Sequence, residues 1–537
     1  MPTTQDHPAV GRRPGRARRA AVAGLALVAV TAGACSSADL QEGGIPAGAG
    51  GSSLSASAVD ASVPMLDEIV EEVMAETGIP GVAVAVVHDD RVVTTRGYGV
   101  REAGTDEPVD EDTVFQLASL SKPVGSTVIS GLVGEGVVSW DDPIVEHLPD
   151  FELSDPWVTE HVTIGDMYAH RSGLPGTVAG NDLENMGFDR AEILQRLRYL
   201  PLDPFRITYS YSNFGMTTGG EAAARANGTT WETAAEEVLF EPAGMTSTSF
   251  RNSDFLAEDD RASLHVRQGG EWVPAFSRQP DAQAPAGGAS SNVVDLARWM
   301  RLELNGGELD GEQIIDSDAL VPAHTPQITS RPPADPATPA SGYGYGWDVS
   351  MAAYAPGQVQ WSHSGAFSVG AATTVRLLPG LDLGVMVLTN AAPVGGAEAI
   401  AEMYLDRLIN GQQTQDWVTI WHERFAPLLE APTYDEPATP TPQRAASAYV
   451  GTYENGYYGT IEIVEEGGEL VMRWGPGLER TLELEHFDGD QFLYVDYPEI
   501  EGGKTPLAFQ FGSGPDATAL VLGAFEPQGD FQVLVRS

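Results

Sequence analysis

One stretch near residue 120 constrains the fold of this chain more than any other. Val124, Val128 and Leu132 recur at intervals of four. This spacing predicts a helix that is buried on most of its surface. Ser119 should lie at the N-terminus of this helix. Lys122, three residues later, should share a helix face with Ser119.

A serine beside an amine at the head of an apolar helix can act as a nucleophile. Burial lowers the pKa of a lysine, so Lys122 can take the proton of Ser119. The free N–H groups of a helix N-terminus also favour the anion that forms. The alternative is an ordinary helix cap with an exposed lysine. Composition weighs against this alternative, because only Lys122 and Lys504 are lysines among 30 basic residues. The others are arginine, which does not release its proton in a protein.

The length and charge of the chain narrow its class. A chain of 537 residues is expected to form two or three domains. Its net charge of −46 argues against nucleic-acid binding, since no basic patch offsets the 76 acidic residues. The charge fits a highly soluble, surface-exposed protein.

The N-terminal 34 residues have the pattern of a bacterial lipoprotein signal peptide. A basic region precedes an apolar stretch at 20–30 that is shorter than a membrane span, and small residues then precede Cys35. We therefore expect an exported protein, anchored to the outer face of the cell membrane by a lipid on Cys35. An incidental buried thiol is the alternative. The pair Arg18 and Arg19 leaves twin-arginine export open as well. A single cysteine excludes a disulfide within the chain.

The rest of the chain divides by composition and periodicity. Residues 35–60 are rich in Gly, Ser and Ala and read as a flexible tether. Residues 61–412 should form one α+β domain, in which helices are inserted between two parts of an antiparallel sheet. A connecting helix and a Pro-rich linker should occupy 413–444. Eight short strands spaced along 445–537, one of them at 481–485, predict a small antiparallel β-barrel. The strands expected in the larger domain are 82–88, 91–98, 358–362, 371–378 and 383–389.

Three motifs follow one another at domain-scale spacing. They are Ser119-x-x-Lys122, Tyr211-Ser-Asn213 and His363-Ser-Gly365. In this order they resemble the motifs of the serine β-lactamase and penicillin-binding-protein superfamily. The resemblance is greater to the class C β-lactamase-like branch, which includes D-aminopeptidases, DD-carboxypeptidases and esterases. It covers about 61–410 and is supported by 140–143, 170–176 and 285–292. Residues 445–537 resemble the lipocalin-like barrels appended to some of these hydrolases.

The resemblance implies a role for each motif residue. Ser119 would be the acylated nucleophile, and Lys122 and Tyr211 would share the work of general base and acid. The sequence leaves open which of the two is the base. A tyrosine in this role needs a depressed pKa, which a nearby ammonium favours. Asn213 would bind the substrate amide or Lys122. The backbone N–H groups of Ser119 and Ala366 would form the oxyanion hole.

His363 departs from the superfamily pattern. β-Lactamases and many peptidases carry lysine there, and its fixed charge binds the substrate carboxylate. A histidine is mostly neutral at pH 7 unless a neighbour raises its pKa. This favours a peptidase, amidase or esterase over an efficient β-lactamase. Ser364 and Gly365 would let the substrate backbone lie against the strand.

Two classes of function remain in competition. The first is a serine hydrolase acting on D-amino-acid-containing peptides, amides or carboxylic esters. The second is a penicillin-binding or sensor-like module that is acylated without efficient turnover. No cofactor or metal site is expected, because the ten histidines show no ligand spacing. The barrel could shield the catalytic domain or support oligomers, or one of its loops could reach over the active site. The substrate and the oligomeric state stay open.

Overall fold

The structure, a computed structural model, describes residues 54–176, 179–333 and 335–537. Cys35, the expected signal peptide and most of the expected tether lie outside these residues. The last part of the expected tether is helical. In α1 (Ala56–Ala61), Ser55 caps the helix and Val59 is buried. Within the described ranges, the structure contains no helix with the length and apolar character needed to cross a membrane.

An eight-stranded sheet forms the centre of the larger domain. All of its neighbouring strands are antiparallel, in the order β2-β1-β14-β13-β12-β11-β10-β9. Two strands come from the start of the domain and six from its end, so the chain between them is inserted. The α+β expectation is thus confirmed, although β9 to β11 were not foreseen. The strands are β1 (Gly81–His88), β2 (Arg91–Gly99), β9 (Ile328–Arg331), β10 (Ser341–Tyr343), β11 (Asp348–Met351), β12 (Val359–Phe367), β13 (Ala371–Leu378) and β14 (Leu383–Thr389).

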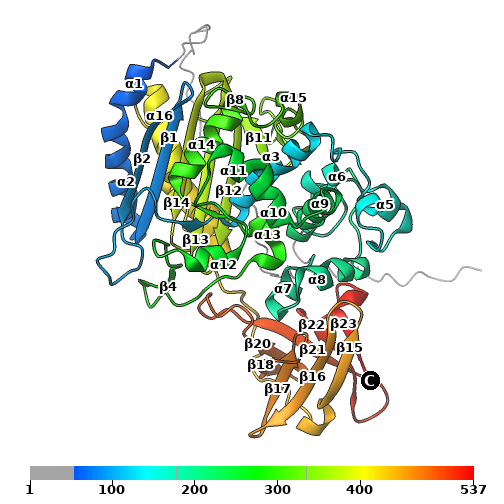
Figure 1. Ribbon diagram of the computed structural model, residues 1–537. Coiled ribbons are helices and arrows are strands. Elements are labelled where there is room, and N and C mark those ends of the chain that lie inside the picture. Colours follow the sequence, from blue (N-terminus) through cyan, green and yellow to red (C-terminus); the bar gives the residue numbers. More distant parts are fainter. Residues whose placement is uncertain (1–53, 177–178, 334) are drawn as a thin grey trace, which may run out of the picture.

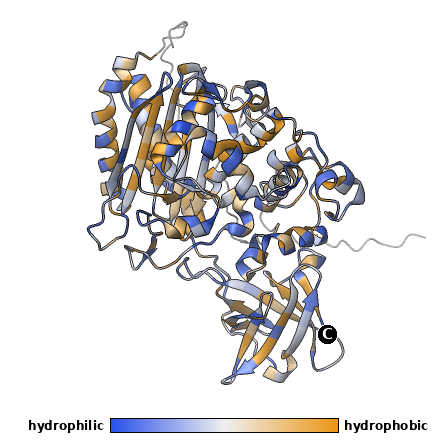
Figure 2. Ribbon diagram, viewed as in Figure 1, coloured by the Kyte–Doolittle hydropathy of each residue, from blue (hydrophilic) through white to orange (hydrophobic). Residues whose placement is uncertain are grey.

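Helices cover both faces of this sheet, as its buried strands require. Every residue of β1, β13 and β14 is buried. One face packs against α2 (Val63–Thr77), α16 (Gly396–Asn410) and α17 (Trp417–Leu429). The other face packs against α14 (Val293–Leu304). Figure 2 shows hydrophobic residues along the strands and on the helices beside them.

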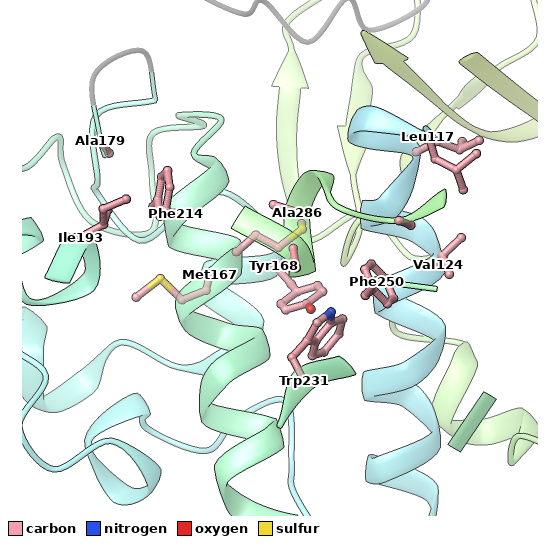
Figure 3. Close-up of a cluster of buried hydrophobic side chains, with 14 of the residues drawn as sticks. Leu117, Val124, Met167, Tyr168, Ala179, Ile193, Phe214, Trp231, Phe250 and Ala286 are labelled. Carbon is pink, nitrogen blue, oxygen red and sulfur yellow. The ribbon is translucent and has the colours of Figure 1, made fainter. Parts of the chain in front are cut away.

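The inserted segment forms a helical region beside the sheet. Its core lies between α3 (Ser121–Gly134) and α9 (Asn213–Ala226), where Tyr168 and Trp231 are wholly buried (Figure 3). This core holds the first turn of α3 in place. The other helices here are α4 (Ile144–His147), α5 (Pro156–His161), α6 (Ile164–Tyr168), α7 (Asn181–Met186), α8 (Arg190–Arg196), α10 (Trp231–Ala235), α11 (Glu241–Ala243), α12 (Asn252–Ala257), α13 (Ala284–Gly287) and α15 (Ser317–Leu320).

The C-terminal part is a nearly closed antiparallel barrel of nine strands, in the order β18-β17-β16-β15-β23-β22-β21-β20-β19. The sequence indicated eight strands. The expected strand 481–485 ends early, and Leu484 donates its N–H to Leu470 before a further strand begins. The strands are β15 (Gly451–Asn455), β16 (Gly459–Glu466), β17 (Glu469–Trp474), β18 (Arg480–Glu483), β19 (Glu485–Asp488), β20 (Gln491–Tyr494), β21 (Thr505–Phe511), β22 (Ala517–Leu522) and β23 (Val533–Arg536).

The barrel packs directly against the larger domain at α7 and α8 (Figure 1). The Tyr457 hydroxyl accepts the N–H of Gly180 at 3.0 Å and donates to the Asp182 carboxylate at 2.7 Å. Arg196 donates to the Tyr457 carbonyl at 2.9 Å. Two side chains and a backbone group therefore tie the barrel to the helical region.

Candidate active site

Ser119 lies on a tight turn that ends directly at α3. The turn is a 3-10 helix over Ala118–Leu120, and Ala118 has a φ of +50°. A left-handed conformation is uncommon for a residue with a side chain, and such strain is concentrated at functional sites. Ser121 supports the turn, since its hydroxyl donates to Ala118 at 2.6 Å and accepts from Ala289 at 2.9 Å.

Lys122 occupies the first turn of α3 and is completely buried. Its Nζ lies 3.0 Å from the Ser119 hydroxyl, 2.8 Å from Asn213 Oδ1 and 2.8 Å from the Ala286 carbonyl. Asn213 donates through Nδ2 to Asn181 at 3.3 Å, which turns its Oδ1 toward the lysine. The predicted serine–lysine pair is therefore brought together.

These three contacts determine how a neutral Lys122 would be oriented. Burial lowers the pKa of Lys122 well below its ordinary value. The oxygens of Asn213 and Ala286 can only accept hydrogen bonds. A neutral amine has two hydrogens, which these two oxygens take. Its lone pair then faces the hydroxyl of Ser119.

The ring of Tyr211 lies over the amine of Lys122. Its ring centre lies 4.6 Å from Lys122 Nζ, and its hydroxyl is buried without a hydrogen-bond partner of normal geometry. Burial raises the pKa of Tyr211 above its usual range, and the nearby Ser119 hydroxyl lowers it by less. The depressed pKa expected from the sequence is thus not found. Burial disfavours the phenolate more strongly than the neighbouring groups favour it.

His170 packs against Tyr211. The sequence placed it only within the supporting stretch 170–176 and indicated no role for it. Its Nδ1 accepts the N–H of Ser212 at 3.1 Å, and its ring lies 4.3 Å from that of Tyr211 and 5.0 Å from that of Tyr343. Burial, aided by Lys122 and His363, lowers its pKa well below the ordinary value. His170 is therefore a neutral imidazole behind Tyr211.

His363 lies on β12 and is buried beside Tyr343. Its Nδ1 lies 2.8 Å from the Ser364 carbonyl, which can only accept, so Nδ1 carries the hydrogen. Nε2 then accepts from the Tyr343 hydroxyl at 3.1 Å. Burial, followed by the charges of Lys122 and Arg376, lowers the pKa of His363 to about 3. His363 is thus neutral at pH 7.

The two residues after His363 differ in what they contribute. Strand alternation turns the Ser364 side chain to the opposite face, where it bonds Thr374 at 3.1 Å. The Ser364 side chain therefore points away from His363, and only its backbone is left for the expected role beside the substrate. A Cβ on Gly365 would lie 2.2 Å from the Leu117 carbonyl and 2.8 Å from the Leu120 nitrogen. Gly365 therefore lets β12 approach the nucleophile turn, and the Ala366 backbone follows it.

A cavity of about 390 Å³ opens beside these residues, between the two domains. Asn213, which is bonded to Lys122, is in its wall, as are Phe367 and Ser368 at the end of β12. The barrel supplies the opposite wall through Arg480 and a loop at 496–499. No motif in the sequence marked these barrel residues. A loop reaching toward the active site was one of the two expected roles of the barrel.

One group of residues in the described chain could hold a metal ion. Ligand atoms of Asp142, Glu146 and His147 lie within 4.8 Å of one another. Asp142 and His147 are already bonded to each other at 3.0 Å, and none of the three is in the wall of the cavity beside Asn213. The group is partly exposed and separate from the Ser119 cluster.

Comparison with known proteins agrees with this geometry. The model of the Beta-lactamase family matches residues 66–407, and that of a domain of unknown function, DUF3471, matches 435–535. Among curated proteins, the Unguisins hydrolase ungD' of Aspergillus campestris is 27% identical over 87% of this chain and 91% of its own. Penicillin-binding protein 4 of Amycolatopsis lactamdurans is 28% identical over 59% of this chain and 82% of its own.

Solved structures share the fold. The octameric penicillin-binding protein homologue from Pyrococcus abyssi has a TM-score of 0.56 and 21% identity, and covers 88% of this chain and 99% of its own. A class C β-lactamase from Rhodobacter sphaeroides has a TM-score of 0.52 and 22% identity, over 64% of this chain and 98% of its own. The family match spans most of the chain, including the turn of Ser119 and the strand of His363. The chain belongs to the Beta-lactamase family of serine hydrolases and carries a C-terminal DUF3471 domain.

Proposed function

We propose that this protein is a serine hydrolase that works through an acyl-enzyme on Ser119, with Lys122 as the general base. The observation that carries the proposal is the environment of Lys122 Nζ. Two obligate acceptors, Asn213 Oδ1 and the Ala286 carbonyl, and one hydroxyl, that of Ser119, lie within 3.0 Å of it. An amine held in this way can accept only from Ser119.

The acylation step follows from this arrangement. Lys122 takes the proton of the Ser119 hydroxyl as Oγ attacks the substrate carbonyl carbon. The carbonyl oxygen becomes an anion that the backbone N–H groups of Ser119 and Ala366 stabilise. When the intermediate collapses, the leaving group departs with the proton that Lys122 took, either directly or through Tyr211, which gives its hydroxyl proton and receives the one on Lys122 in return. Lys122 is then neutral again, and Tyr211 retains its proton, as its raised pKa favours. Water then hydrolyses the ester on Ser119 with the same base.

We propose D-amino-acid-containing peptides, amides or carboxylic esters as substrates. A neutral His363 provides no fixed charge for a substrate carboxylate, which speaks against an efficient β-lactamase. The name of one relative, a hydrolase matched over most of both chains, supports turnover over a non-hydrolysing sensor. We further propose that the protein is exported and lipidated on Cys35, in keeping with residues 1–34.

The decisive experiment is hydrolysis of a p-nitrophenyl acyl ester by a protein that starts at residue 54, because Val59 is part of the core. Ser119→Ala is the matched variant. Steady turnover that is lost in Ser119→Ala supports the proposal. A single stoichiometric burst would indicate the sensor-like function instead, and equal rates in the two proteins would exclude Ser119 as the nucleophile.

A further inference from the structure

The cavity between the two domains carries unequal charge. Within its wall, the acidic residues are Glu184, Asp496 and Glu499, and the basic ones are Arg278 and Arg480. Glu184 is bonded to Arg278. The ionisable groups that remain are two carboxyl groups from the barrel loop and one guanidinium.

Asp496 is the carboxylate whose position points to a ligand. It is 8% exposed, and its Oδ1 is buried without a hydrogen-bond partner. No ion pair within 4.0 Å joins Asp496 to Arg480 among the described residues. Burial raises the pKa of Asp496 to about 7, and the nearby Arg480 guanidinium offsets this rise only in part. A buried carboxylate oxygen without a partner is costly, and a bound cation would remove that cost.

Contacts across the cavity hold the loop of Asp496 against the catalytic domain. The Ser368 hydroxyl donates to Glu499 at 2.7 Å, and Ser368 lies two residues after Ala366 along the chain. On the other side, Asn213 links the cavity wall to Lys122. Because Lys122 is bonded to both Asn213 and Ser119, the cavity lies next to the nucleophile.

From this juxtaposition we propose that Asp496, with Glu499, binds an ammonium group of the substrate on the acyl side of the scissile bond. The enzyme would then prefer acyl groups with a free amine, such as an unblocked amino acid or a basic side chain. Phe276 and Phe367 in the same wall suit the apolar stem that carries the amine. The inference rests on the proposed function and narrows its substrate class. It makes the barrel a part of the substrate site.

Two esters of matched length test this assignment on the full chain. p-Nitrophenyl 6-aminohexanoate ends in an ammonium, and p-nitrophenyl heptanoate ends in a methyl group at the same place. We expect Asp496→Asn to lower kcat/KM at least tenfold for the amino ester and less than threefold for heptanoate. Glu501→Gln removes an exposed carboxylate on the same loop, outside the cavity wall, and should leave both values within twofold.

Several outcomes would overturn the assignment. An equal loss for both esters in Asp496→Asn would make Asp496 a structural residue, and no loss would remove it from the site. A preference for mono-p-nitrophenyl adipate, which ends in a carboxylate, would assign the cavity to anions through Arg480. Asp496→Glu keeps the carboxylate and should retain more of the preference for the amino ester than Asp496→Asn does. This comparison distinguishes loss of the charge from loss of the fold.

Binding measured without turnover separates failure of this inference from failure of the proposed function. In the Ser119→Ala variant, 6-aminohexanamide should raise the melting temperature more than heptanamide. This difference should vanish in the Ser119→Ala/Asp496→Asn double variant. If both esters resist hydrolysis but the difference is present, the cavity still binds amines and only the proposed chemistry is wrong. Equal shifts by the two amides would refute the ammonium site.

Discussion

The Tyr343 hydroxyl donates a hydrogen bond of 3.1 Å to Nε2 of His363. Nδ1 of the same ring donates to the Ser364 carbonyl, so both ring nitrogens are occupied by partners that suit a neutral imidazole. Protonation would place a second N–H against the hydroxyl and a positive charge near Lys122 and Arg376. His363 is thus held neutral by its hydrogen bonds as well as by burial.

This neutral histidine should make the folded protein sensitive to acid. The pKa of His363 is about 3 in the folded chain and near its ordinary 6.5 when unfolded. Between these values the unfolded chain binds a proton that the folded chain does not, so stability falls as the pH decreases through this window. Lowering the pH from 7 to 4.5 should reduce the unfolding free energy of the wild type. In His363→Gln, which lacks the imidazole, this reduction should be smaller by about 2 kcal/mol. Urea titrations at the two pH values measure this, and equal losses would show that His363 does not titrate as described.

The same residue should limit the use of carboxylate-bearing β-lactams. Because His363 stays neutral down to low pH, acidification from pH 7 to pH 5.5 should not improve benzylpenicillin hydrolysis relative to a neutral p-nitrophenyl ester. The ratio of the two kcat/KM values cancels the protonation of the shared base. A ratio that rises with a midpoint between pH 5 and pH 7 would contradict a neutral His363.

Replacing Lys122 should abolish the chemistry even when the charge is retained. Lys122→Arg keeps a cation that cannot accept a proton, so kcat/KM on a p-nitrophenyl ester should fall by at least about a hundredfold. Circular dichroism and the melting temperature test whether the fold survives. Lys504→Arg, on the barrel surface, is the control and should leave turnover unchanged. Turnover near the wild-type rate in Lys122→Arg would refute the role of general base.

The proposed base should also set the lower limb of the pH–rate profile. Since burial lowers the pKa of Lys122, the amine becomes neutral below its ordinary range, and kcat/KM should rise with pH as it deprotonates. The midpoint should lie well below the ordinary lysine value. A midpoint at the ordinary lysine value, near 10.5, would contradict a buried Lys122 as the base.

The Tyr457 hydroxyl should stabilise the contact between the domains. Tyr457→Phe leaves the Gly180 N–H and the Asp182 carboxylate without this partner, which should cost about 1–3 kcal/mol. Urea unfolding followed by tryptophan fluorescence measures the loss. Tyr199→Phe changes a half-exposed tyrosine on the adjoining turn and should stay within about 0.5 kcal/mol. Equal losses of stability in the two variants would show that the Tyr457 hydroxyl does not stabilise the contact between the domains.

Local patterns in the sequence were sufficient for the general architecture and for the main motifs. The apolar spacing after Ser119 predicted a buried helix, and α3 is buried along almost all of its length. Strands β13 and β14 begin and end where the sequence indicated. Periodicity is a local property, so these elements could be foreseen. The short strands β9 to β11 carry too few residues for a pattern and were missed.

The sequence by itself determined that a serine, a lysine and a tyrosine would occur in motifs of a known order, with a histidine in place of the usual second lysine. Only the tertiary structure decided their protonation. Lys122 loses its proton readily and Tyr211 retains its own because both are buried, and burial depends on residues far away in the chain. It also decided that Ala286 would complete the lysine site and that the barrel loop of Asp496 would form a wall of the cavity. Such contacts join segments separated by more than a hundred residues, and no local pattern encodes them.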